Sequence, residues 1–95
     1  MSAVTVHLPG VLRPLAGGAA KVAVPVSGHA TMADVLARLA ELHPGVHARV
    51  VDERGAVRKH VNVFVGEESI RLTGVLATPV APGDDVWVIP AVSGG

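Results

Sequence analysis

A chain of 95 residues is long enough for one small domain with a single core and leaves no room for a separate cofactor-binding domain. Its eight basic and eight acidic residues cancel, and the basic residues are scattered, which argues against nucleic-acid binding by phosphate neutralisation. The absence of cysteine excludes a disulfide framework, a thiolate metal site and a thiol nucleophile.

Targeting signals are also lacking in the sequence. The first residues do not combine a basic region with an apolar run, and no stretch approaches the roughly 18 apolar residues of a membrane span. A cysteine-free chain fits a reducing compartment. We therefore expect a cytoplasmic protein that has no membrane partner and is monomeric when alone.

The first 26 residues predict two strands. Val4, Val6 and Leu8 alternate with polar residues, which is the period of a half-buried strand. After a loop rich in proline and glycine, residues 21–26 read as a second strand, and Pro25 places it at a sheet edge, where no backbone donor is missed. The two strands are expected to form a hairpin.

A helix is expected to follow, beginning at Thr31. This residue is a good N-cap, and Asp34 three positions later completes a carboxylate variant of the capping box. The helix should stop at residues 43–45, because the residue before a proline disfavours the α region. Residues 45–60 are polar, with at most a short helix around Val46 to Val50. One apolar face follows from the helical spacing of Met32, Val35, Leu36, Leu39 and Leu42.

The second half returns to strands. Residues 61–65 alternate, residues 70–72 read as a brief strand, and residues 73–78 can hold a short helical turn. A tight turn at residues 82–84 leads into a last strand over residues 85–89. This order predicts an α+β fold with one sheet wrapped on one helix. It matches the ubiquitin-like β-grasp, a mixed sheet of four to five strands on one main helix, over residues 1–90, with a flexible diglycine tail at residues 91–95.

The final residues carry the most specific signal, and the chain resembles the MoaD/ThiS family of ubiquitin-like sulfur carriers. Members of that family end in an apolar strand and a tail close to Pro-x-Val-x-Gly-Gly, here Pro90 to Gly95. Within the family the chain is most similar to the actinobacterial CysO-type carrier. That likeness is carried by Leu12-Arg13-Pro14 with Gly17-Gly18, by residues 60–65, and by Leu76-Ala77-Thr78.

The diglycine suits chemistry at the terminus. A carboxylate is a poor electrophile, so it must be activated, typically by ATP as an acyl-adenylate, before a sulfur nucleophile can convert Gly95 into a thiocarboxylate. Glycine has no Cβ to narrow the approach and accepts many backbone conformations. Five residues beyond Pro90 reach about 17 Å when extended. Val92, Ser93 and Gly94 would then thread into the channel of an activating enzyme. The alternative is that the last residues are a frayed chain end without a chemical role.

A docking patch is predicted from strand alternation. If Asn62 and Asp85 face solvent, Phe64, Trp87 and Ile89 do so as well. Neighbouring strands would then bring these three side chains into one exposed apolar patch, which is typical of a partner interface. The alternative is a slip of one residue that places Phe64 or Trp87 in the core.

The resemblance implies a protein co-substrate with no bound cofactor, rather than an enzyme. No metal site is expected, because Pro44 and Gly45 between His43 and His47 break the helix face that a two-histidine site would need. An E1-like enzyme would consume ATP to adenylate Gly95 and install the sulfur. The CysO-type likeness implies a PLP-dependent cysteine synthase using O-phosphoserine as acceptor system, with a metallopeptidase that releases the product. Molybdopterin, thiamine and thiosugar synthases are alternative acceptors. A ubiquitin-like modifier of lysines and a plain interaction module also remain open.

Overall fold

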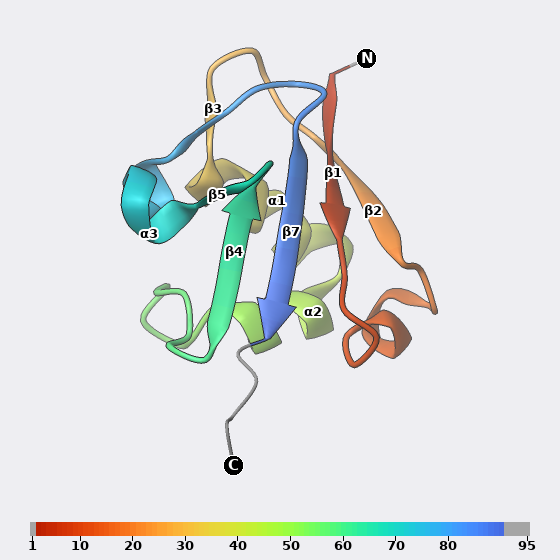
Figure 1. Ribbon diagram of the computed structural model, residues 1–95. Helices are drawn as coiled ribbons and strands as arrows, with labels where there is room; N and C mark the ends of the chain where they lie inside the picture. Colours follow the sequence, from red (N-terminus) through yellow and green to blue (C-terminus); the bar gives the residue numbers. More distant parts are fainter. Residues whose placement is uncertain (1, 91–95) are drawn as a thin grey trace.

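A computed structural model describes residues 2–90 and shows a mixed sheet with helices on one side (Figure 1). The strand order is β2-β1-β7-β4-β5. Strands β1 and β7 are parallel, whereas β2 pairs with β1, and β4 with both β7 and β5, in antiparallel fashion. The predicted α+β β-grasp is thereby confirmed. The strands span Ala3–His7 (β1), Lys21–Pro25 (β2), Val61–Val65 (β4), Glu68–Ser69 (β5) and Asp85–Pro90 (β7).

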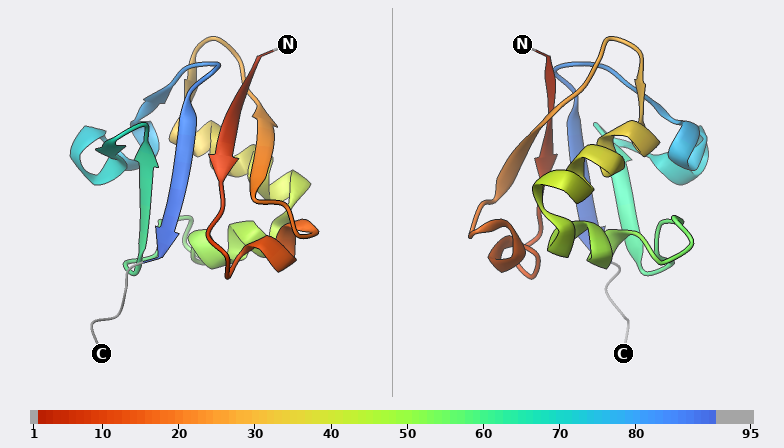
Figure 2. Two further views of the ribbon diagram at one scale, coloured as in Figure 1. Left: turned by 45° about the vertical axis from the view of Figure 1, so that its right-hand side comes forward. Right: turned by 180° about the vertical axis from the view of Figure 1, so that it is seen from behind.

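Two helices cover one face of the sheet, as the view from behind in Figure 2 shows. They are α1 (Met32–Leu42) and α2 (Pro44–Val50). A third helix, α3 (Ile70–Thr73), follows β5. The remaining elements are the 3₁₀ turns η1 (Arg13–Ala16) and η2 (Val75–Ala77) and a small second sheet of β3 (Ala30–Thr31) and β6 (Pro79–Val80).

The core lies between the sheet and α1. Alternate residues of the long strands point inward because successive side chains leave a strand on opposite faces. Val4, Val24, Val63 and Val86 are each at most 1% exposed and meet the apolar face of α1. Since every second residue of each strand points into this core, the residues between them point to the outer face. The α1 residues in this core are Met32, Val35, Leu36 and Leu39.

The predicted capping box of α1 is confirmed. The Thr31 backbone N–H donates to Asp34 Oδ2 at 2.8 Å, and the Asp34 N–H donates to Thr31 Oγ1 at 3.4 Å. The helix ends at Leu42 with His43 as its C-cap, and α2 begins at Pro44, with Val46 and Val50 buried.

Leu42 was expected on the buried face of α1 and is instead 41% exposed. It is the last residue of the helix. The chain turns into α2 directly after it, and Val46 of α2 is fully buried.

The brief strand expected at residues 70–72 is wrong, because Ile70 begins α3. Ser69 caps this helix, its Oγ accepting from the Arg71 N–H at 3.3 Å, and Gly74 ends it at φ 117°, a left-handed value that favours glycine. Strand pairing stops earlier, with β5 at Glu68 and Ser69. The helical turn predicted over residues 73–78 is confirmed as η2.

The hairpin, the edge position of β2 and the turn before β7 agree with the predictions. The β1–β2 hairpin forms and β2, which ends in Pro25, lies at the sheet edge. The tight turn before β7 is held by Asp84, whose N–H donates to the Ala81 carbonyl at 3.0 Å and whose Oδ2 accepts from the Ala81 N–H at 2.9 Å. Within residues 2–90 no helix is long and apolar enough to cross a membrane.

Candidate docking face and tail

The three predicted docking residues lie on the outer face of the sheet, away from the helices. Phe64 of β4 and Trp87 of β7 are direct register partners across the two antiparallel strands. Trp87 is 42% exposed, Ile89 is 45% exposed and Phe64 is half-buried. The predicted alternation of faces is therefore confirmed, and the slip that would bury Trp87 is excluded. We call Phe64, Trp87 and Ile89 the apolar strip.

His7 adds a contact that strand alternation alone did not assign to the site. The parallel register places His7 of β1 beside Trp87. Their rings stack with centroids 3.7 Å apart and an angle of 7° between planes. His7 Nε2 also lies 2.8 Å from Asp85 Oδ1, so the imidazole is held by the stack on its face and by a hydrogen bond at its edge. The stack restricts the orientation of Trp87, which remains 42% exposed.

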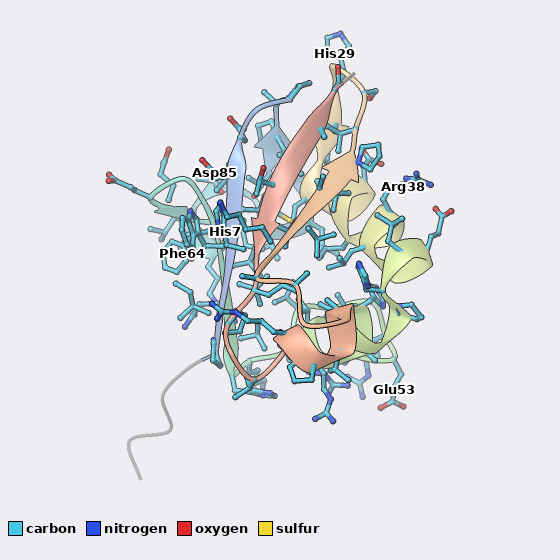
Figure 3. The ribbon with its side chains drawn as sticks, turned by 90° about the vertical axis from the view of Figure 1, so that its right-hand side faces the viewer. His7, His29, Arg38, Glu53, Phe64 and Asp85 are labelled. Atoms are coloured by element: carbon cyan, nitrogen blue, oxygen red, sulfur yellow. The ribbon has the colours of Figure 1, made fainter. Side chains whose placement is uncertain are left out.

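Figure 3 places His7, Phe64 and Asp85 together on the outer side of the sheet, whereas Arg38 lies on the helical side. The alternation along the first strand already puts His7 on the face opposite to Val6 and Leu8, which is the outer face. What the sequence lacked was the neighbour, because periodicity along one strand says nothing about which other strand lies beside it. The contact to Asp85 depends on the same β1–β7 pairing.

Two hollows flank Trp87 on this face. One of about 350 Å³ lies toward β1 and β2 and is lined in part by His7, Pro9 and Pro90. The other, about 480 Å³, lies toward β4 and is lined in part by Phe64 and Glu67. Trp87 and Ile89 line both, so they form the ridge between the hollows. A ridge of apolar side chains between two depressions is a shape that a complementary protein surface can enclose.

Strand β7 ends directly before the tail. Pro90, the last described residue, is paired with Val61 of β4, so the strand runs one residue further than predicted. The tail residues Val92, Ser93, Gly94 and Gly95 lie outside the described residues, and the roles expected for them stay predictions. Within residues 2–90 no group of three or more histidine or acidic side chains is placed to hold a metal ion.

Comparison with known proteins identifies the family. The model of the ThiS family matches residues 6–95. The chain is 39% identical over 94 residues to the sulfur carrier protein CysO of Mycobacterium tuberculosis, covering 97% of this chain and 98% of that protein. It is 36% identical over 78 residues to small archaeal modifier protein 1 of Haloferax volcanii, covering 82% of this chain and 85% of that protein.

A solved structure agrees with this assignment. The structure of the Amycolatopsis orientalis BexX/CysO complex contains a chain that superimposes with a TM-score of 0.87 at 35% identity, covering 98% of this chain and all of that one. The relatives named here are carriers and modifiers rather than catalysts. The chain belongs to the ThiS family and is a ubiquitin-like protein of the sulfur-carrier type.

Proposed function

We propose that this protein carries sulfur as a thiocarboxylate on Gly95. The carboxylate oxygen attacks the α-phosphorus of ATP in an E1-like enzyme, releasing pyrophosphate and leaving an acyl-adenylate. A sulfur nucleophile at the sulfide level then attacks the acyl carbon, and AMP leaves. The observation that carries the proposal is the similarity to a sulfur carrier over 97% of this chain, together with a ThiS-family match that extends through the C-terminal Gly94 and Gly95.

The outer face of the sheet supports a docking role. Strand β7 bears Trp87 and Ile89 and leads into the tail, so a partner that covers the apolar strip also stands beside the start of the tail. The existence of a complex that contains a CysO protein supports partner enzymes for a carrier of this type. The body of the domain would then provide affinity, while Val92, Ser93 and Gly94 lead Gly95 to the reacting atoms.

Cysteine synthesis is the acceptor pathway that the similarity to CysO favours. The acceptor would be a PLP-dependent synthase that uses O-phosphoserine, and a metallopeptidase would release the product from the carrier. A thiosugar synthase, or one for molybdopterin or thiamine, would draw on the same thiocarboxylate. Presenting the thiocarboxylated protein to each purified synthase, and following the loss of its sulfur, separates these acceptors.

Protein modification is a second candidate, favoured by the similarity to a small archaeal modifier protein. The same activated Gly95 would form an amide with a lysine amine instead of accepting sulfur. Lys21 and Lys59 are the only lysines of the chain, so attachment to a second copy would use one of them or its N-terminus.

Intact-mass spectrometry of the protein isolated from its host tests both candidates. A mass increase equal to the replacement of one oxygen by sulfur, located on Gly95 by fragmentation, is expected for the carrier. Covalent adducts through Gly95 would indicate the modifier. The matched control is a variant that lacks Gly95, which should show neither change. An unmodified terminus in cells with active sulfur metabolism would overturn both proposals.

A further inference from the structure

Basic side chains surround the point at which β7 ends. The hollow on the β1 side of Pro90 is lined by Arg13 and Lys21. A second hollow of about 170 Å³, on the opposite side of Pro90, is lined by Arg49 and His60. Within the described chain, neither hollow includes a carboxylate among its lining residues.

A third hollow extends the same surface. It measures about 390 Å³ and is lined by Ala48, Arg49, Arg58 and His60, so its ionisable groups are all basic. It shares Arg49 and His60 with the second hollow, which touches Pro90. The basic side chains come from η1, β2, α2 and the segment before β4. We call Arg13, Lys21, Arg49, Arg58 and His60 the basic collar.

Within the part of the chain that the structure describes, no collar residue forms an ion pair, and Asp52, beside Arg58, is an acidic neighbour that acts on the collar at longer range. The ion pairs there join His7 to Asp85 and Arg38 to Glu41, and neither pair involves a collar residue. Two members are held in place by backbone carbonyls. Arg13 Nε donates to the Leu8 carbonyl at 3.1 Å, and Arg58 Nε donates to the Ala48 carbonyl at 3.1 Å.

Charge is divided along the length of β7. Glu67 and Asp85 line the hollow at the start of the strand, whereas the collar surrounds its end. The whole chain has no formal net charge, so this division is a matter of placement rather than of composition. Gathered like charges repel one another, and a surface of this kind favours partners that offer the opposite charge.

We propose that the basic collar docks against an acidic rim around the active-site opening of the E1-like enzyme that receives the tail. This inference rests on the proposed function and adds the chemistry of the partner surface. The apolar strip would supply contact area, and the collar would steer the encounter so that Pro90 faces the opening. Steering of this kind raises association rates by about 10- to 1,000-fold and weakens as salt increases.

Lys21→Glu combined with Arg49→Glu tests the inference. Both residues are exposed, lie on opposite sides of Pro90, and have side chains without a hydrogen bond to another described residue, so folding should be unchanged. Association with the host's purified E1-like enzyme is measured by stopped flow over a range of salt concentrations. We expect the association rate to fall about tenfold or more at low salt, with a flatter salt dependence.

Arg38→Glu is the control, since it reverses one charge on α1, away from the hollows around Pro90 (Figure 3). Its association rate should stay within about twofold of the wild type, because Arg38 lines none of these hollows. Equal rates and equal salt dependence for the control and the double variant would overturn the inference. The inference would also be overturned if the wild type bound a mixed-sequence RNA oligonucleotide and the double variant did not, while both bound the enzyme equally. That result would assign the collar to nucleic acid.

The proposed function is judged separately by mass spectrometry at saturating enzyme. If wild-type protein gains no sulfur there, the proposed function fails, whatever the association rates show. If the double variant associates slowly yet gains sulfur fully at saturation, both proposals stand. If it gains sulfur fully and associates as fast as the wild type, only the collar inference fails.

Discussion

Trp87 is the residue on which the outer face depends most. It is the only tryptophan of the chain, it lines the hollows on both sides of β7, and His7 stacks against it. An aromatic side chain that is already held in its orientation loses little freedom when a partner covers it. Residues of this type commonly contribute a large share of binding energy at interfaces.

Trp87→Asp should weaken binding to the E1-like enzyme by about 2 kcal/mol while leaving the fold largely intact, because the side chain lies outside the core. Isothermal titration measures the binding, and far-UV circular dichroism checks the fold. Leu72→Asp is the control, since Leu72 is 86% exposed on α3 and outside the apolar strip. An unfolded Trp87→Asp protein would contradict the assignment of Trp87 to a docking face.

Asp52 orders the loop after α2. Its Oδ1 accepts from the Arg54 N–H at 2.8 Å and from the Ala56 N–H at 3.1 Å. The bond from Ala56, followed by that from Arg54, lowers the pKa of Asp52 below its ordinary value of 3.8. Because the folded pKa is the lower one, this contribution to stability is present above pH 3.8 and is lost as the pH falls through the folded pKa.

We expect the amide resonances of Arg54 and Ala56 to titrate together, with a midpoint below pH 3.8. Two-dimensional NMR from pH 6 downward, in roughly half-unit steps, measures this midpoint. Asp52→Asn should abolish the titration at both amides. A midpoint at or above 3.8 would show that the two hydrogen bonds do not favour the carboxylate.

At the scale of elements, α1 shows how local signals set helix boundaries. Thr31 and Asp34 exchange backbone and side-chain hydrogen bonds, and both residues were identifiable from spacing alone. Residues 70–72 show the opposite case. Their apolar-polar-apolar order suits a strand, yet the Ser69 cap and Gly74 make a single helical turn the conformation that satisfies the backbone there.

Thr31→Ala should lower the free energy of unfolding by about 1 kcal/mol, because the Asp34 N–H loses its side-chain acceptor. Urea unfolding measures this loss. Thr31→Ser retains the hydroxyl and should recover most of the stability. If the alanine variant were as stable as the serine variant, the capping bond would contribute nothing to the folded state.

At the scale of the whole molecule, one core joins the sheet to α1. Leu39 is fully buried against that core, and Leu42, three residues later on the same helix, is 41% exposed. The outer face is formed by the strands whose inner residues make the core. Loss of the core should therefore dismantle the apolar strip and the basic collar together, in one cooperative transition.

Leu39→Ala should cost about 2 to 5 kcal/mol of stability and lower Tm by about 10 °C or more. Leu42→Ala makes the same chemical change at an exposed position and should cost far less. Fluorescence of Trp87 and circular dichroism, followed during heating, should report the same midpoint in each protein. Equal losses in the two variants, or separate midpoints for the two signals, would contradict a single core.

The sequence by itself determined the properties that depend on near neighbours in the chain. The capping box at Thr31, the exposed parity of Trp87 and Ile89, and the Pro90 to Gly95 motif all follow from spacing or residue type. Local hydrogen bonds and the alternation of side chains act over a few residues, so they can be read without a structure. The β-grasp could be named from the strand order together with the terminal motif.

Only the tertiary structure decided which distant residues meet. The stack of His7 on Trp87 requires the parallel pairing of the first strand with the last, and these residues are 80 positions apart. The basic collar collects residues from four segments around Pro90, where the sequence shows only scattered charges. Pairing of strands and convergence of loops depend on packing the whole core at once, which no local pattern encodes.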